Sequence, residues 1–221
     1  MKLHKGEVLG VFGLMGAGRT ELLEEIFGAE GDETSLQRLD IQIEGKTIQI
    51  RSPLDAIRAG IALVPEDRKK DGLFLDADVK ENICITTLDN ILNESKRVAL
   101  TDRYINDLKI KTSSQQQSVG TLSGGNQQKI VLAKWLATNP KILMLDEPTR
   151  GIDIHAKSEI YELISKLAKE GMGIIVVSSE LPEILALSDR IVVMADHKIT
   201  AEFEASQATE GTILKEAIPK S

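Results

Sequence analysis

The residues best suited to chemistry lie between Leu122 and Asp153. A serine and two glycines, Ser123–Gly125, precede an amphipathic helix pattern. Free backbone N–H groups and the helix dipole at such a helix start favour an anion, and glycine lets a phosphate approach the backbone closely. Two adjacent carboxylates, Asp146 and Glu147, follow a short apolar strand pattern. Ligands sit at the carboxyl ends of parallel strands, so one carboxylate suits a metal ion and the other suits an attacking water.

A second phosphate-binding pattern lies near the start of the chain. The glycine-rich segment Gly13–Thr20 follows an apolar strand pattern and precedes a helix pattern over Glu21–Phe27 that ends at Gly28. Backbone N–H groups of such a turn can cradle a phosphate, and the Thr20 hydroxyl can ligate Mg²⁺. Many strand–helix turns are rich in glycine, so the pattern gains its weight from the acidic strand and serine–glycine loop that follow in order.

These segments resemble the motifs of ABC-transporter ATPases. Gly13–Thr20 resembles the Walker A loop, Leu122–Asn126 the signature loop, and Ile142–Glu147 the Walker B strand. The variants LSGGNQQK and LDEPTRGID more narrowly resemble the ATPase subunits of bacterial ribose, xylose and galactose importers. In that family one polypeptide carries two nucleotide-binding domains in tandem. This chain resembles the second of them along nearly its whole length.

The resemblance implies an α/β fold, the P-loop NTPase fold with a mostly parallel central sheet. Alternation of strand and helix patterns along the chain favours the same doubly wound sheet. We expect a single domain over residues 1–221, with a core of 6–78 and 141–221. An inserted α-helical subdomain over about 79–140 carries the signature loop. The antiparallel β subdomain of the family is expected to be truncated.

The resemblance also implies the cofactors ATP and Mg²⁺ and a set of site residues. Catalytic roles fall on Glu147 and Ser179, and metal binding falls on Thr20, Asp146 and Glu66. The nucleotide-binding positions are Gly13, Leu14, Met15, Gly16, Ala17, Gly18, Arg19, Thr20, Glu21, Ser123, Gly124, Gly125, Asn126 and Asp153. In the family, the signature loop closes over the γ-phosphate held by the partner domain.

Two of these acidic residues also have simpler interpretations. Asp153 resembles the loop that crosses the dimer seam, but it is equally an N-cap for the helix pattern that follows, and both roles are compatible. Glu147 resembles the water-activating carboxylate, and its alternative is a capping acid before Pro148.

Three positions depart from the family pattern around the γ-phosphate. Arg19 stands where lysine is usual, and a planar guanidinium is not equivalent to a compact ammonium. Glu66 replaces a glutamine, and Ser179 replaces a histidine whose reach and charge a hydroxyl lacks. We therefore expect the chain's own site to hydrolyse ATP weakly, although the presence of the Glu147 carboxylate favours hydrolysis.

The resemblance further predicts the partners and the location. The partner is the first nucleotide-binding domain of the same protein, or a second copy in a dimer. Membrane permease subunits would dock around Glu66–Asn82, and a sugar-binding protein would act indirectly, so the location is the cytoplasmic face of the membrane. One rival hypothesis is a non-catalytic nucleotide-sensing regulatory module. A third is an ABC-type ATPase that acts on DNA or ribosomes.

Composition narrows the class of protein. The net charge of −7 over 221 residues argues against a surface that binds nucleic acid, so we expect no nucleic-acid partner. The single Cys84 excludes an internal disulfide and fits a reducing compartment. No apolar run reaches the roughly 18 residues that a membrane span needs. The charged segment Asp67–Gly72 is either a solvated turn or a docking surface.

Hydrophobic periodicity predicts the remaining elements. A hairpin is expected within 39–50 after a polar loop, Gly31–Leu39. The predicted strands are 7–12, 60–65, 142–145, 173–177, 190–194 and 199–203. The predicted helices are 53–59, 81–92, 101–108, 127–137, 154–168, 181–187 and 207–217. Met1–Val11 holds no aromatic residue to stack on adenine, so we expect an excised fragment with weak adenine selectivity by itself.

Overall fold

A six-stranded sheet forms the centre of the computed structural model, which describes residues 1–29, 40–87 and 93–219. The strand order is β4-β5-β6-β1-β7-β8. The strands from β4 to β7 are parallel, and β8 pairs antiparallel with β7. Their bounds are β1 Val8–Gly13, β4 Ile61–Val64, β5 Ile142–Asp146, β6 Gly173–Ser178, β7 Arg190–Ala195 and β8 Lys198–Glu204. The predicted α/β fold with a mostly parallel sheet is confirmed, and the predicted sheet strands are found close to their expected limits.

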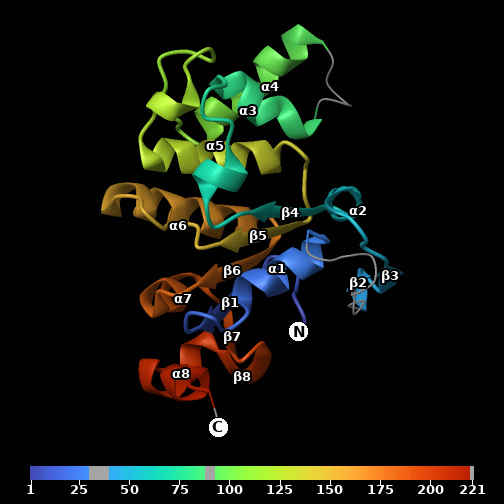
Figure 1. Cartoon of the computed structure of the whole chain (residues 1–221), viewed down its shortest axis with the longest axis vertical. Helices are drawn as coiled ribbons and strands as arrows, with labels where there is room; N and C mark the ends of the chain where they lie inside the picture. Colours follow the sequence, from blue (N-terminus) through green and yellow to red (C-terminus); the bar gives the residue numbers. More distant parts are fainter. Residues whose placement is uncertain (30–39, 88–92, 220–221) are drawn as a thin grey trace.

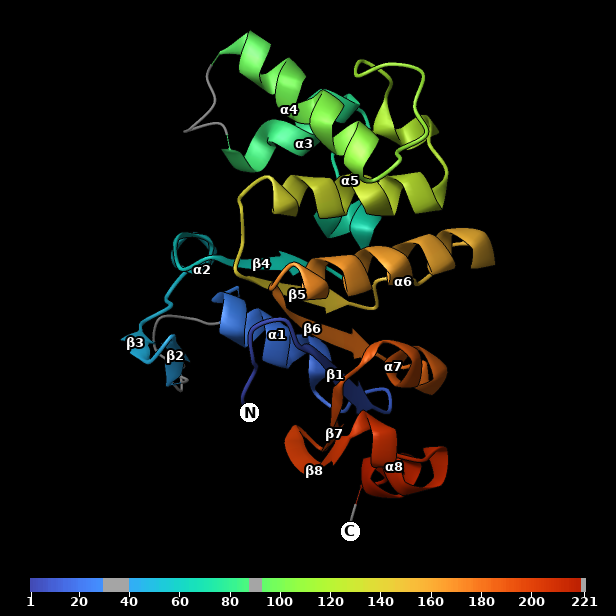
Figure 2. The same ribbon diagram turned by 180° about the vertical axis from the view of Figure 1, so that it is seen from behind.

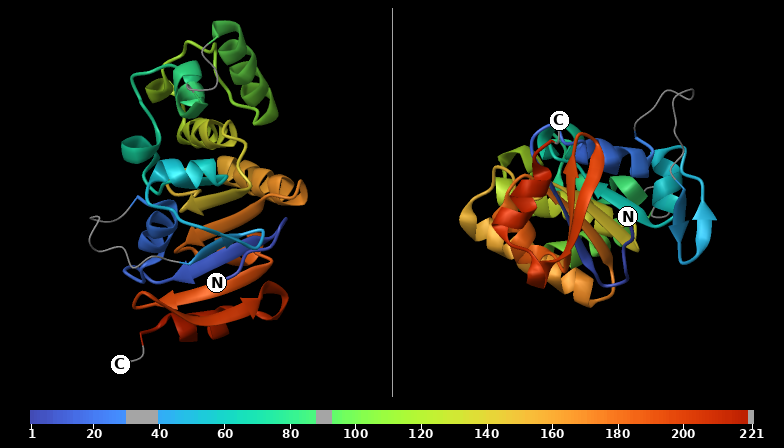
Figure 3. Two further views of the ribbon diagram at one scale, coloured as in Figure 1. Left: turned by 90° about the vertical axis from the view of Figure 1, so that its right-hand side faces the viewer. Right: turned by 90° about the horizontal axis from the view of Figure 1, so that it is seen from below.

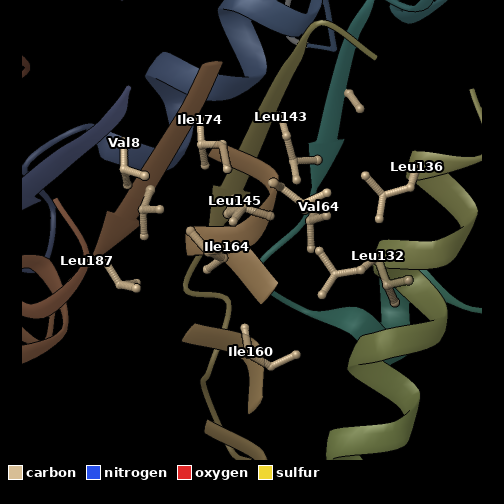
Figure 4. Close-up of a cluster of buried hydrophobic side chains, with 14 of the residues drawn as sticks. Val8, Val64, Leu132, Leu136, Leu143, Leu145, Ile160, Ile164, Ile174 and Leu187 are labelled. Atoms are coloured by element: carbon tan, nitrogen blue, oxygen red, sulfur yellow. The ribbon is translucent and has the colours of Figure 1, made fainter. Parts of the chain in front are cut away.

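The apolar strands are buried on both faces, which explains their nearly continuous hydrophobic sequence. Along β5, Leu143 and Leu145 enter one hydrophobic cluster, whereas Met144 enters the other. Figure 4 shows Leu143 and Leu145 on the side that faces Ile164 and Leu132. Because side chains alternate along a strand, helices are needed on both sides of the sheet.

Different helices cover the two faces. One face packs against α1 Arg19–Phe27 and α2 Pro53–Arg58. The other packs against α5 Gly124–Leu136, α6 Ile154–Lys169, α7 Leu181–Leu187 and α8 Glu210–Ala217. Figures 1 and 2 show α8 at one end of the molecule, beside β7 and β8.

The opposite end is helical, as predicted, but two helix limits were wrong. Figure 1 shows α3 Val79–Cys84, α4 Glu94–Asp107 and α5 gathered there. In place of the helix predicted over 81–92, the structure has the short α3. This helix begins earlier than predicted because Asp78 and Glu81 form a capping box, and a 3₁₀ turn at 85–87 follows it. The helix predicted over 101–108 begins at Glu94, because the Asn93 side chain caps it. Residues 88–92 lie outside the described residues, as does the predicted loop Gly31–Leu39.

The predicted hairpin is confirmed as a separate two-stranded antiparallel sheet, β2 Ile41–Ile43 and β3 Lys46–Ile48. Its turn residues Glu44 and Gly45 both have positive φ, the geometry that tight hairpins favour. Figure 3 shows this hairpin at the side of the main sheet. For the charged segment Asp67–Gly72 the sequence left two interpretations open, a solvated turn or a docking surface. The segment contains a single π-helical turn over 68–72, and the Asp67 carboxylate caps the start of this turn.

Across the described ranges 1–29, 40–87 and 93–219, no helix combines the length and apolar character needed to cross a bilayer.

Candidate functional site

Four parallel strands end at the same edge of the sheet and bring the predicted site segments together. Phe12 of β1 lies opposite Ser178 of β6, and Asp146 of β5 lies opposite Val177. The segments that leave this edge are 13–20 after β1, 65–67 after β4, 146–149 after β5 and 178–180 after β6. Motifs that are far apart in the sequence therefore lie in a single site, because the strands that precede them run in the same direction.

The glycine-rich segment Gly13–Thr20 forms a tight turn that leads directly into α1. Gly16 and Gly18 have φ of 80° and 89°, which glycine adopts without the steric cost of a Cβ. The N-cap residue of α1 is Gly18, which has no side chain to cap the helix, so among the described residues its first backbone N–H groups are available to an anion. The helix begins at Arg19 rather than at the predicted Glu21, because the left-handed Gly18 turns the chain into it. Glu21 is exposed in the first turn.

Asp146 is a buried carboxylate whose Oδ1 atom lacks a hydrogen-bond partner within the described part of the chain. Burial raises the pKa of Asp146 to about 6, and the nearby Glu147 carboxylate acts in the same direction. A hydrogen bond from Thr20 and the charge of Arg19 oppose that rise. A bound cation would supply the missing partner and favour the charged carboxylate.

Thr20 and Asp146 fit a magnesium ion only together with a ligand from outside the chain. They lie near each other at the start of α1, close enough for the Thr20 hydroxyl to lower the pKa of the Asp146 carboxyl. Within the described residues, no group of three or more His, Cys, Asp or Glu side chains could hold a metal. Mg²⁺ is commonly bound through one or two protein oxygens, with phosphate and water completing its shell. The donor set therefore fits a metal that arrives with a phosphate.

Glu147 is held in a strained conformation by groups from two segments, the start of α1 and the end of β6. Its φ of 44° is unusual for a residue with a side chain, and such strain is often found at functional sites. Arg19 Nη1 lies 3.3 Å from Glu147 Oε1, and the Ser179 backbone N–H donates to the same oxygen at 2.7 Å. The Ser178 hydroxyl donates to Oε2 at 3.4 Å. The Ser179 contact is made by its backbone, so the predicted role of its hydroxyl stays a prediction.

Glu66, predicted as a metal ligand, forms an ion pair with Arg150. Arg68 reinforces this link, because its Nη1 and Nη2 donate to the carbonyl oxygens of Arg150 and Gly151 at 2.8 and 3.3 Å. The loop after β4 is thus fastened to the loop after β5. For Glu66 to reach a metal ion, its ion pair with Arg150 would have to open.

The signature loop, residues 122–126, begins α5 next to the start of α6. A Cβ on Gly125 would meet the Ala156 Cβ at 2.4 Å, closer than two carbon atoms can approach. A Cβ on Gly124 would meet Arg68 Nη2 at 2.8 Å. Packing within the chain therefore requires Gly125 independently of any phosphate, whereas at Gly124 the flexible end of the Arg68 side chain could move aside.

A cavity of about 290 Å³ lies beside this loop. Its lining includes Ser123, Gly125, Asn126 and Asp153. The Asp153 carboxylate accepts a hydrogen bond from the Ala156 N–H at 2.9 Å, which confirms its predicted N-cap role for α6. That bond is the largest cause of a lowered pKa for Asp153. The predicted role of Asp153 at a dimer seam stays a prediction, as do the other ligand-binding roles.

Several residues that organise the site were not predicted from the sequence. Arg68 and Arg150 join two loops, and the buried Thr149 hydroxyl donates to Glu183 Oε1 at 2.7 Å. The His197 N–H donates to the Ala17 carbonyl at 3.0 Å, which ties the β7–β8 turn to the glycine-rich turn. These contacts link residues distant in the sequence, so no local spacing could have indicated them.

The family model described as ABC transporter matches residues 1–150. The ribose import ATP-binding protein RbsA of Rhodopirellula baltica is 50% identical over 225 residues, covering 100% of this chain and 43% of that protein. The xylose import ATP-binding protein XylG of Moorella thermoacetica is 50% identical, covering 96% of this chain and 42% of that protein. The arabinose import ATP-binding protein AraG of Mannheimia succiniciproducens is 50% identical, and the match covers 100% of this chain and 44% of that protein. The chain thus spans less than half the length of these relatives.

Solved structures show the same fold at lower identity. A nucleotide-free ATP-binding cassette from an ABC transporter superposes with a TM-score of 0.81 at 20% identity, covering 100% of this chain and 91% of that chain. A dimeric ATP-binding cassette bound to ADP and Pi superposes with a TM-score of 0.77 at 20% identity, and the match covers 93% of this chain and 88% of that chain.

Proposed function

The chain belongs to the ABC transporter family, and from that premise we propose that it is the second nucleotide-binding domain of a sugar-import ATPase. It couples binding and hydrolysis of MgATP to monosaccharide uptake. The proposed domain spans 1–221, with a core of 6–78 and 141–221 and a helical subdomain of about 79–140.

The observation that carries this proposal is the pairing of Asp146 with Thr20 at the uncapped start of α1. Within the described residues, the buried Asp146 has an oxygen without a hydrogen-bond partner, and it lies next to a helix start that the N-cap residue Gly18 leaves without a side-chain cap. Negative phosphate oxygens complement the helix start, and a cation complements the carboxylate. Magnesium triphosphate supplies both charges in one ligand.

Each residue at the edge of the sheet has a defined role in this proposal. The N–H groups of Gly13–Thr20 hold the β-phosphate, and Thr20 and Asp146 hold the metal ion. A magnesium ion held by Thr20 and Asp146 would supply positive charge against the phosphate oxygens. Glu147 orients the attacking water and accepts its proton. Before it does so, Arg19 must leave the Glu147 carboxylate, which it contacts at 3.3 Å.

We expect this site to hydrolyse ATP weakly. Arg19 forms an ion pair with Glu147 Oε1, and the Ser179 N–H donates a hydrogen bond to the same atom. Arg150 forms an ion pair with Glu66. Releasing these contacts competes with catalysis, because each one stabilises the resting arrangement. Ser179 adds no imidazole to the γ-phosphate side of the site.

The signature loop acts on the partner's nucleotide. Ser123, Gly124, Gly125 and Asn126 complete the stronger site of the first nucleotide-binding domain, or of a second copy. One ATP then joins two half-sites, and hydrolysis releases them. Membrane permease subunits dock around residues 66–82 and hold the chain at the cytoplasmic face of the membrane, with a sugar-binding protein acting indirectly. The rival regulatory module is less favoured, since relatives about 50% identical are named as import ATP-binding proteins.

The test compares Ser123→Ala with Glu147→Gln in the intact protein that contains this chain. Steady-state ATP hydrolysis should fall about tenfold or more in Ser123→Ala, because a hydrogen bond to a charged phosphate is lost. Glu147→Gln should leave most of the activity, and Ser165→Ala, an exposed serine on α6, serves as the control.

Two results would contradict the proposal. If Glu147→Gln abolished hydrolysis as fully as Ser123→Ala, the site on this chain would be a main catalytic site. If Ser123→Ala changed nothing and the chain bound no MgATP, the nucleotide-binding role itself would be wrong.

A further inference from the structure

Ser123 stands at the N-cap position of α5, but its side chain does not cap the helix. In α2, α3, α6 and α8 the side chain at this position accepts a backbone N–H from the first turn, although in α7 it does not. A serine at an N-cap ordinarily makes the same bond. At α5 another group therefore determines the direction of the hydroxyl.

That group is the side-chain amide of Asn126. Its Oδ1 accepts a hydrogen bond from the Lys111 backbone N–H at 2.8 Å. A backbone N–H can only donate, so this contact assigns the oxygen end of the amide. The amide nitrogen Nδ2 consequently faces Ser123 and donates to its Oγ at 2.9 Å.

This arrangement leaves the Ser123 hydroxyl with its hydrogen free. A hydroxyl has one hydrogen to donate and lone pairs that accept, and Asn126 uses a lone pair. Within the described residues, no side chain or backbone oxygen accepts the Ser123 hydrogen. Ser123 and Asn126 both line the cavity of about 290 Å³, together with Lys111 and His155. Phosphate oxygens can only accept, so a hydroxyl must donate in order to bind one.

We propose that Asn126 is a positioning residue that holds the Ser123 hydroxyl as a hydrogen-bond donor to the terminal phosphate of a nucleotide on the partner domain. This inference rests on the proposed function of the signature loop. The Lys111 N–H orients the amide of Asn126, and the amide orients the hydroxyl. Asn126 itself need not touch the phosphate.

A purely structural role for Asn126 would follow from the same two bonds, since they tie the segment at Lys111 to the start of α5. The two roles differ once the Ser123 hydroxyl has been removed. If Asn126 acts through that hydroxyl, its own removal then costs nothing further. If it only holds the fold together, its removal still costs activity and thermal stability in the Ser123→Ala background, because the bond to the Lys111 N–H is intact there.

The experiment is a double-mutant cycle in the intact protein, read as the kcat for ATP hydrolysis. We expect Ser123→Ala and Asn126→Ala each to lower kcat, the former by about tenfold or more. The double variant should match Ser123→Ala alone. Asn126→Asp should lower kcat further than Asn126→Ala, because a carboxylate would take the hydroxyl hydrogen for itself. Asn106→Ala, on the exposed surface of α4, is the matched control and should leave kcat unchanged.

The outcomes separate this inference from the proposed function. No effect of Ser123→Ala would refute the proposed function of the loop. A clear effect of Ser123→Ala with a further, undiminished loss in the double variant would refute only the role of Asn126. Equal kcat in Asn126→Ala and the wild type would refute that role as well. Thermal melting of each variant checks that loss of folding does not cause the change.

Discussion

Replacing Asp146 with asparagine should stabilise the nucleotide-free chain at neutral pH while removing its response to MgATP. Burial raises the pKa of Asp146 from 3.8 to about 6, so the charged carboxylate is unfavourable in the folded state. Asparagine has nearly the same shape and no charge. The substitution therefore removes the cost of ionising a buried group along with the proposed metal ligand.

The size and sign of the effect follow from that pKa. Between about pH 4 and pH 6 the folded chain binds more protons than the unfolded chain, so its stability falls as pH rises. The pKa values differ by about 2, which corresponds to about 3 kcal/mol at most. Above pH 6 the full cost is present, and below pH 4 it disappears. For a chain of this size, 1 kcal/mol corresponds to about 2–4 °C in melting temperature.

The assay is denaturant unfolding of the wild type and Asp146→Asn at intervals between pH 4 and pH 8. The free energy of unfolding of the variant, relative to that of the wild type, should increase by about 2–3 kcal/mol from pH 4 to pH 8. Asp76→Asn, an exposed aspartate, controls for the general effect of losing a carboxylate. MgATP should then stabilise the wild type but not Asp146→Asn. A difference between the two proteins that stays constant with pH would refute the reasoning.

Two further substitutions test the packing around the site. Gly125→Ala should cost about 1–3 kcal/mol in urea unfolding, because its Cβ would meet Ala156 at 2.4 Å; Gly211→Ala, with nothing within 4 Å, is the control, and equal stability of the two variants would contradict the account. Thr149→Val should cost about 1–3 kcal/mol, since it leaves the buried Glu183 without its hydroxyl donor. Thr149→Ser keeps the hydroxyl and should recover most of that loss, and a failure to do so would assign the effect to the methyl group.

The types of the sheet elements and the order of the motifs could be predicted from the sequence. Apolar runs bounded by glycine and by charged residues are local signals, and β5 ends at Asp146, one residue beyond its predicted limit. Helix limits were less predictable where a cap decided them. Asn93 starts α4 earlier than its apolar pattern indicates, because the first turn of that helix, residues 94–97, carries no hydrophobic signal.

The sequence by itself determined which residues could bind phosphate and metal: the glycine-rich turn, the acidic pair and the serine–glycine loop. Only the tertiary structure decided which of them are engaged by other groups. Arg19 contacts Glu147 across 128 positions of the chain, and Arg150 pairs with Glu66. Such contacts depend on the register of neighbouring strands and on the directions of side chains, which no short stretch of sequence contains.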